Sequence, residues 1–336
     1  MITDIIPKLI DRLNLNEIEA RHAMEELMAG RATDAQVAAF LTALRMKGET
    51  PCELATFARV MRERAEPFWD GDRVSVLDTC GTGGDRSGTF NISTASAFVV
   101  AGAGIRVAKH GNRAASSKCG SADVMEALGI DIQMPSDRLR HAITGIGIGF
   151  LFAQRYHTSM KHVMPARNQL GVRTVFNFIG PLSNPAHPDF QVLGVSSMMV
   201  LELVAKSLQE LGTRHAFVIH GNDGIDEISI SAPSTIRELK DGEIKSYTIS
   251  PEDFGFFSVS AEKIKGGDAT TNASIIEAIL GGERGPRRDV VLLNAAAAIV
   301  AGEMADSLAE GIQQAEESID SGAALSKLHR LRELSK

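Results

Sequence analysis

The sequence has few cysteines and no concentration of positive charge. Its 336 residues contain three cysteines, Cys52, Cys80 and Cys119, and no two of them form a C-x-x-C pair. An odd number of cysteines without this spacing argues against a disulfide framework or a zinc site, and it suits a reducing compartment. The formal net charge is −7, and no long segment is rich in lysine and arginine. We therefore expect no nucleic-acid partner, because basic segments usually bind such partners.

The sequence also lacks a hydrophobic run long enough to cross a membrane. Its most apolar late stretch, residues 290–301, contains Asn294 and is shorter than the roughly 20 residues that a membrane helix needs. The first four residues include Asp4, where a secretion signal would carry basic residues. Hydrophobic residues make up 44% of the chain and charged residues 23%, as in globular proteins. We expect a cytoplasmic protein without a membrane partner.

The pattern of elements changes near residue 70. Asn16 with Glu19 and Thr33 with Gln36 form capping-box patterns, and residues 1–70 are expected to be entirely helical. After them, β-type runs alternate with loops and helical segments. These runs lie at residues 74–77, 105–108, 149–152, 191–195, 216–219 and 227–231. The alternation predicts a small all-helical N-terminal domain followed by a large α/β domain with binding sites at strand ends.

A glycine-rich loop follows the first β-type run. Residues 81–88 contain four glycines, which let backbone N–H groups approach an anion closely. Arg86 stands where a Rossmann fingerprint needs its last glycine, and Thr89-Phe90 replaces the Lys-Ser/Thr pair of a P-loop. The alternative is a tight turn between a strand and a helix. We favour an anion-binding loop, because turns seldom contain four glycines in eight residues.

The next helix opens with Asn91, Ile92, Ser93 and Thr94. Ser93 or Thr94 is a natural N-cap, and for an isolated Ser-Thr pair capping alone would be the better explanation. After a glycine loop, the free N–H groups and the dipole of this helix start can also hold a phosphate.

A second loop, residues 109–123, is cationic and rich in hydrogen-bond donors. It follows a β-type run, precedes a helix expected at residues 121–128, and contains two lysines, one arginine and three serines. A solvated basic loop is the alternative. Beside the glycine-rich loop at a neighbouring strand end, an anion cradle is the better explanation.

A third loop carries two adjacent carboxylates, Asp226 and Glu227, after the β-type run at residues 216–219. Magnesium commonly binds through few carboxylates together with substrate phosphates. An acidic surface turn is the alternative, and the spacing excludes an EF-hand.

Two arginines follow in the middle of the chain, Arg167 and Arg173. A guanidinium binds a carboxylate through two parallel hydrogen bonds, so either arginine could read an acidic acceptor. Their sequence context alone does not choose between them.

Taken together, these motifs closely resemble the anthranilate phosphoribosyltransferase family. The resemblance runs nearly end to end and also includes residues 266–269 and 294–297. Its motifs are Gly81-Thr-Gly-Gly-Asp85, Asn91-x-Ser93-Thr94, Lys109-His-Gly-Asn-Arg113, Gly120-Ser-Ala-Asp123, Arg173-Thr-Val-Phe-Asn177, Gly180-Pro-Leu-Ser-Asn-Pro185 and Asp226-Glu227.

The resemblance implies a nucleoside phosphorylase/phosphoribosyltransferase-like fold. Residues 1–70, joined by helices from about 165–187, would form the helical domain, and residues 73–336 an α/β domain with a central mixed sheet. It also implies a homodimer joined through the helical domains, and an active site between the two domains.

The resemblance assigns substrates and a cofactor as well. The implied activity is transfer of the phosphoribosyl group of phosphoribosyl pyrophosphate (PRPP) to the amine of anthranilate, with Mg²⁺ and without an obligatory nucleophile. Magnesium would bind Ser93, Asp226 and Glu227. Anthranilate would contact Gly81, Asn112 and Arg167, with His110, His157 and Pro181 nearby. PRPP would be held by Gly81, Gly84, Asp85, Thr89, Asn91, Ile92, Ser93, Thr94, Lys109, His110, Gly111, Asn112, Arg113, Ala114, Ala115, Ser116, Ser117 and Ser121.

The sequence departs from the family pattern at Thr158-Ser159, where Pro-Ala is expected, and at Cys119, where serine is commoner. A pyrimidine nucleoside phosphorylase is the nearest alternative, but its lysine-histidine-serine loop would differ from residues 109–113. A non-catalytic relative that binds nucleic acid is a second alternative, and the negative charge and the Asp226-Glu227 pair argue against it.

Overall fold

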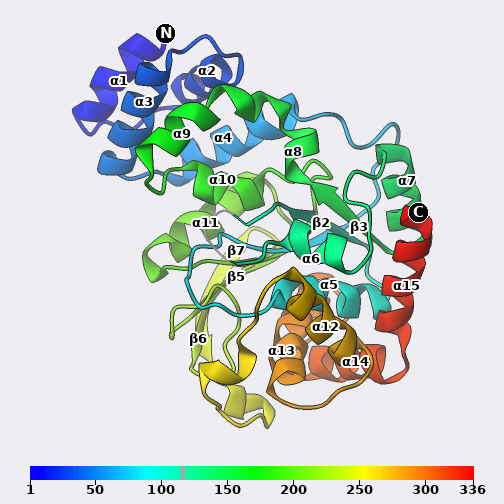
Figure 1. The fold of residues 1–336 in the computed structure, drawn as a ribbon. Coiled ribbons are helices and arrows are strands. Elements are labelled where there is room, and N and C mark those ends of the chain that lie inside the picture. The colour runs from blue at the N-terminus through cyan, green and yellow to red at the C-terminus, as the bar shows by residue number, and fades with distance from the viewer. Residues whose placement is uncertain (115–117) are drawn as a thin grey trace.

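The computed structural model describes residues 1–114 and 118–336 and divides into a helical head and an α/β body (Figure 1). The head begins with α1 (Ile2–Ile10), α2 (Glu17–Met28), α3 (Asp34–Lys47) and α4 (Pro51–Arg64). Asn16, Thr33 and Thr50 cap the last three of these helices, each accepting a hydrogen bond from the backbone three residues on. The capping patterns at Asn16 and Thr33 are therefore confirmed.

The middle of the chain returns to this head. After α8 (Ala153–Tyr156) and a 3₁₀ turn (Thr158–His162), α9 (Met164–Leu170) packs on α3, and α10 (Phe176–Leu182) packs on α4. Figure 1 shows α9 beside α3 and α4, with α10 between the head and the sheet.

The body is built on a seven-stranded sheet of order β3-β2-β1-β4-β5-β6-β7. The strands β1 (Leu77–Gly81), β2 (Val107–Gly111), β3 (Ile148–Phe152), β4 (Phe190–Gly194) and β5 (His215–Gly221) run parallel, and β6 (Ser234–Lys240) and β7 (Glu243–Ile249) are antiparallel. The predicted mixed sheet is confirmed.

Parts of the strand prediction are wrong: β2 is Val107–Gly111 rather than 105–108, and β6 and β7 were not predicted. The first strand is Leu77–Gly81 rather than 74–77, because the ladder with β4 begins at Leu77 and continues to Gly81. Residues 227–231 form no strand; their backbone bonds instead to side chains such as Asn294 and Ser234.

Helices cover both faces of the sheet. One face packs against α5 (Ile92–Gly102) and α13 (Pro286–Ala301), outside which lie α12 (Ala269–Leu280), α14 (Leu308–Asp320) and α15 (Ala323–Ser335). The other face packs against α11 (Met198–Glu210) and, through α10, the head. Short helices α6 (Ser121–Ala127) and α7 (Ser136–His141), a π-helical turn (Ala142–Ile146) and 3₁₀ turns (Pro251–Phe254 and Ala261–Ile264) complete the chain.

The apolar interior forms two clusters of buried residues. One lies between the sheet and α5, α13 and α15. The other contains the head helices together with Leu193 and Val195 at the end of β4 and Val218 of β5. The head is therefore continuous in its packing with one face of the sheet.

Candidate active site

Three predicted loops meet at the carboxyl ends of the parallel strands. The chain adds strands on one side of β1 and then crosses to β4 on its other side. Such a reversal of strand order is where open α/β sheets bind ligands. The backbone N–H of Gly83 in the first loop donates to Oδ2 of Asp226 in the third loop over 2.7 Å. A Cβ on Gly81 would overlap the same carboxylate, so this approach requires glycine.

The start of α5 joins the second and third loops. The backbone N–H of Ser93 donates to Oε1 of Glu227 over 3.1 Å. Nζ of Lys109, in the middle of β2, donates to the hydroxyl of Ser93 over 3.3 Å and to the carbonyl of Thr79. Ser93, Lys109 and Glu227 therefore converge at the N-terminus of α5, where the helix dipole also favours an anion.

Lys109 is a buried cation without a direct carboxylate contact among the described residues. Its side chain is 3% exposed. Burial lowers the pKa of its ammonium, and the charge of Asp78 acts in the opposite direction. A buried ammonium surrounded by neutral oxygen acceptors is suited to an anionic group in a substrate.

The acidic side chains Asp85, Asp226 and Glu227 lie close enough to repel one another. Burial raises the pKa of Asp226 to about 7, and the charge of Asp85 adds to the effect. Burial likewise raises the pKa of Glu227 well above its usual range, and the charge of Asp226 adds. A cation bound between these carboxylates would remove the repulsion.

The donor set fits magnesium. Carboxylate and hydroxyl oxygens are the ligands that a hard cation prefers, and magnesium takes few of them from the protein when phosphates complete its coordination. Among the residues that the structure describes, no group of three His, Cys, Asp or Glu side chains could hold a metal ion by itself. Asp226 and Glu227 therefore suit a cation that arrives with a phosphorylated substrate.

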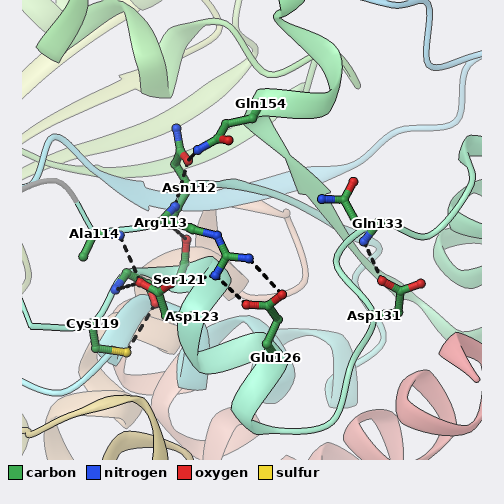
Figure 2. Close-up of polar contacts among 11 residues, drawn as sticks. Asn112, Arg113, Ala114, Cys119, Ser121, Asp123, Glu126, Asp131, Gln133 and Gln154 are labelled. Carbon is green, nitrogen blue, oxygen red and sulfur yellow. Dashed lines mark hydrogen bonds and ion pairs between the residues drawn. The ribbon is translucent and has the colours of Figure 1, made fainter.

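The second loop is tied to α6, as Figure 2 shows. Nη2 of Arg113 donates to Glu126 over 2.9 Å, and Nη1 donates to Asp123 over 3.0 Å. Asp123 also accepts from the backbone N–H groups of Ala114 and Gly120. The guanidinium of Arg113 is thus engaged with the helix; of the other residues predicted in this loop, Ala115, Ser116 and Ser117 lie outside the described residues.

Asn112 and Ser121 lie on the two sides of this loop. The hydroxyl of Ser121 donates to the carbonyl of Asn112 over 3.4 Å, and Nε2 of Gln154 donates to Oδ1 of Asn112 over 3.1 Å. Gly111 ends β2 where a Cβ would overlap Ser121. Gln154, at the start of α8, is a contact that no sequence motif indicated.

Asn91 connects the second loop to α12. Its Nδ2 donates to the carbonyl of Cys119, and its Oδ1 accepts from Nδ2 of Asn272 over 2.9 Å. Oδ1 of Asn272 accepts from the backbone of Gly267. Residues 266–269 contributed to the family resemblance, but no role was assigned to them. Because Asn272 binds both Gly267 and Asn91, this segment supports Asn91.

The remaining predicted residues of the first loop have different surroundings. Thr89 forms a bridge with Lys265, and Asp85 accepts from the backbone of Ser87 over 3.3 Å. Ile92 packs in the core, and the Thr94 hydroxyl is buried without a hydrogen-bond partner among the described residues.

The structure distinguishes the two candidate arginines. Nη1 of Arg173 donates to Ser196 over 3.0 Å and to the carbonyl of Gly84 over 3.3 Å, so this side chain braces the glycine-rich loop. Arg167 stacks on Phe176, and its one hydrogen-bond contact among the described residues is to the sulfur of Met164 at 3.5 Å. Thioether sulfur is a weak acceptor, so the donors of Arg167 are available for a ligand.

Two buried histidines lie edge to face near the end of β2. The ring centroids of His110 and His157 are 5.2 Å apart, and both residues are buried. Burial lowers the pKa of His157 to about 4 and that of His110 well below its usual value. Both rings are therefore neutral at pH 7. Nε2 of His110 has no hydrogen-bond partner among the described residues.

Buried polar side chains hold α10 and the residues that follow it on the sheet. Nε2 of Gln191 donates to the carbonyl of Pro181 over 2.7 Å. Asn184 donates to Asp78 over 2.9 Å, and the second oxygen of Asp78 accepts from the backbone of His110 over 3.2 Å. Asp78, Asn184 and Gln191 are fully buried. The role of these three side chains was not predicted from the sequence, because no motif distinguished them from residues that only support a strand or a turn.

The departures from the family pattern are local. The hydroxyl of Ser159 contacts the sulfur of Met28, and Cys119 contacts its neighbour's carbonyl. Burial raises the pKa of the Cys80 thiol well above its usual value and that of Cys119 to about 11. Neither thiol is activated as a nucleophile.

Known protein families match both parts of the chain. The helical bundle domain of the glycosyl transferase family matches residues 3–65, and the α/β domain of that family matches residues 73–325. An anthranilate phosphoribosyltransferase of Methanocorpusculum labreanum is 52% identical over 331 residues, which cover 98% of this chain and 97% of that protein.

The chain belongs to the anthranilate phosphoribosyltransferase family. A crystal structure of the Thermus thermophilus family member has a TM-score of 0.93 and 44% identity, covering 98% of each chain. The Saccharomyces cerevisiae family member, in complex with PRPP and Mg, has a TM-score of 0.90 and 28% identity, covering 99% of this chain and 97% of that one. In the described part of this chain, no helix is long and apolar enough to cross a membrane.

Proposed function

We propose that this chain transfers the phosphoribosyl group of PRPP to the amine of anthranilate, giving N-(5-phosphoribosyl)anthranilate and pyrophosphate in the pathway to tryptophan. The observation that carries the proposal is the meeting of a helix start, a buried lysine and an acidic pair at one strand edge. This arrangement supplies a site for a phosphorylated donor, and we assign the carboxylate of the acceptor to Arg167, which lies over the Phe176 ring with donors available for a ligand.

PRPP binds across the first two loops. The pyrophosphate lies beside the glycine-rich loop and the start of α5, and Lys109 supplies a buried positive charge. The second loop, from His110 to Ser117, and Ser121 hold the rest of the donor. Arg113 keeps this loop against α6 through Asp123 and Glu126.

Asp226, Glu227 and Ser93 hold Mg²⁺. When bound, this ion neutralises charge that gathers on the leaving pyrophosphate. The protein's part is to hold Asp226 against the glycine-rich loop, where Gly83 donates to it, and Glu227 at the N-terminus of α5, where Ser93 donates to it.

Anthranilate binds between Arg167 and the His110–His157 pair, with Gly81, Asn112 and Pro181 around it. Arg167 reads the carboxylate with two parallel hydrogen bonds. The neutral histidines pack against the ring without adding a second positive charge.

The reaction needs no base before attack, because an aromatic amine is neutral at pH 7. The nitrogen lone pair forms a bond to C1 of the ribose, and the bond from C1 to pyrophosphate breaks and leaves its electron pair on oxygen. The nitrogen, now positively charged, then loses one proton to water. Holding the amine in line with C1 supplies much of the acceleration. Preorganised donors of Lys109 and the loop backbone stabilise the charge of the departing group.

The active protein is a cytoplasmic homodimer joined through the helical heads. The apolar side chains of Ile10, Leu13 and Ile18 in the head are 66%, 54% and 67% exposed. Large exposed apolar side chains on one domain suit contact with a second copy.

The proposal is tested by mixing the protein with PRPP, Mg²⁺ and anthranilate and following the loss of anthranilate fluorescence. Fluorescence should fall only when all three are present, and pyrophosphate should appear in equal amount. If the protein instead splits a pyrimidine nucleoside with free phosphate and leaves anthranilate unchanged, the nucleoside phosphorylase alternative is correct.

A further inference from the structure

Asn294 is a buried amide in the apolar interior of α13. Its side chain is 2% exposed, and its neighbours Leu293 and Ala295 belong to the core. An amide buried without hydrogen bonds is strongly disfavoured, so the partners of Asn294 indicate why the helix carries it.

The amide of Asn294 pairs with both backbone groups of one residue outside its helix. Oδ1 accepts from the N–H of Ile228 over 2.8 Å, and Nδ2 donates to the carbonyl of Ile228 over 3.0 Å. The second hydrogen of Nδ2 goes to the carbonyl of Val290, one turn earlier in α13. Both donor hydrogens of the amide are thus used.

Ile228 directly follows Asp226 and Glu227. The backbone of residues 227–231 is outside the sheet, so no ladder of strand hydrogen bonds fixes it. Asn294 takes the place of a neighbouring strand by pairing with both backbone groups of Ile228. On the far side, the N–H of Ser229 donates to the hydroxyl of Ser234 over 2.8 Å.

The support comes from a rigid part of the body. Residues 290–301 of α13 are buried, and the helix packs against α5, β4 and β5. At the N-terminus of the same α5, the backbone N–H of Ser93 donates to Glu227. One helix layer therefore holds both sides of the acidic pair.

We propose that Asn294 is a positioning residue for the acidic pair: through Ile228 it fixes Asp226 and Glu227 where magnesium and pyrophosphate bind. The inference rests on the proposed function of that pair. Asn294 itself touches neither substrate nor metal; it supports their ligands from behind, and loss of such support typically weakens metal affinity or activity by about 10- to 100-fold.

The test compares two variants with a matched control. Asn294→Asp keeps the shape but turns a donor toward the carbonyl of Ile228 into an acceptor, and Asn294→Leu removes all three bonds. The control is Ser318→Ala: Ser318 is also a buried polar residue of a body helix, and its hydroxyl donates to the carbonyl of Val99 over 2.7 Å, away from the acidic pair.

Binding of Mn²⁺ in the presence of PRPP is measured by electron paramagnetic resonance, beside melting temperature and the kinetic constants. Both Asn294 variants should weaken Mn²⁺ binding and raise the magnesium requirement about 10- to 100-fold, with little change in the KM for anthranilate. Ser318→Ala should lower the melting temperature and leave Mn²⁺ binding unchanged. Equal Mn²⁺ binding by the native protein and a folded Asn294 variant would overturn the proposal.

Hydrogen–deuterium exchange of the native protein gives a second measurement that needs no variant to fold. The Ile228 amide should already exchange slowly before Mg²⁺ and PRPP are added. Fast exchange in the free protein would contradict the inference. The double variant Asp226→Ala, Glu227→Ala separates the two proposals: if it binds Mn²⁺ with PRPP normally, the metal assignment itself is wrong; if it loses Mn²⁺ while Asn294 variants keep it, only the positioning role is wrong.

Discussion

The guanidinium of Arg167 lies 5.0 Å from the centre of the Phe176 ring. A cation over an aromatic face is attracted by the ring without using its N–H donors. Phe176 therefore orients Arg167 while leaving its planar fork for a ligand, whereas Arg173 directs its Nη1 to Ser196 and the carbonyl of Gly84.

Replacing Arg167 should remove recognition of the acceptor's carboxylate. Arg167→Ala should raise the KM for anthranilate about 10- to 100-fold, as expected for a lost charge-assisted hydrogen bond of roughly 1.5–3 kcal/mol. Arg167→Lys should raise it less, since lysine keeps the charge and loses the fork.

Aniline has the amine but no carboxylate. Measuring both acceptors with the native protein and with Arg167→Ala gives a double-mutant type of cycle, in which the carboxylate is the second group removed. The native protein should strongly prefer anthranilate, and Arg167→Ala should lose that preference. A variant that discriminates as well as the native protein would show that another residue reads the carboxylate, with Arg173 the next candidate.

Replacing both Asp226 and Glu227 with alanine should abolish turnover and leave the fold intact, because these side chains bind a cation rather than fill the core. Activity is measured across magnesium concentrations, and circular dichroism reports the fold. Glu243→Ala, at an exposed carboxylate on β7, is the control and should behave as the native protein. Near-normal activity of the double variant at limiting magnesium would contradict the assignment.

Lys109→Ala should weaken the binding of PRPP more than the binding of anthranilate. One charge-assisted hydrogen bond of roughly 1.5–3 kcal/mol corresponds to about 10- to 100-fold in affinity. Isothermal titration calorimetry with each substrate measures the difference. Lys327→Ala serves as a control, because Lys327 is a partly buried lysine that donates to the carbonyl of Ile146, far along the chain from the site. A loss confined to anthranilate would be inconsistent with the cradle.

His157 should make the protein less stable in mild acid. Its pKa is about 4 in the folded protein against an ordinary value of 6.5, because burial disfavours the charged ring. Stability from this group is fully present above pH 6.5 and is lost as the pH falls toward 4, since only the unfolded chain takes up the proton there. The loss is roughly 2 kcal/mol between pH 8 and pH 5.

Urea denaturation of the native protein and of His157→Phe at both pH values measures this effect. The free energy of unfolding of the variant should fall less between pH 8 and pH 5 than that of the native protein. The same fall in both proteins would show that His157 does not contribute.

Short sequence patterns correctly predicted the features that depend on residues close together in the chain. Capping patterns at Asn16 and Thr33 marked helix starts, and glycine spacing marked the loop that approaches Asp226. The sequence also suggested that Asp226 and Glu227 form an acidic pair, but not that Gly83 and Ser93 donate to them, because these partners lie on other strands and helices.

What the sequence left unseen depends on contacts between distant segments. The roles of Asp78, Asn184 and Asn272 come from hydrogen bonds that span 76 to 181 residues of chain, which no local pattern records. The β6–β7 hairpin was missed, and a strand was wrongly expected at residues 227–231, where side chains satisfy the backbone instead.

The shared packing of head and sheet also sets an order of events during synthesis. Leu54 and Phe57 leave the ribosome long before Val195, Val218 and Leu239, yet all five belong to one cluster. The first helices can form early through their own caps. Their apolar faces stay partly exposed to water until the strands in the middle of the chain have been synthesised. The apolar faces of the nascent head therefore gain their remaining partners only once β4 and β5 are made.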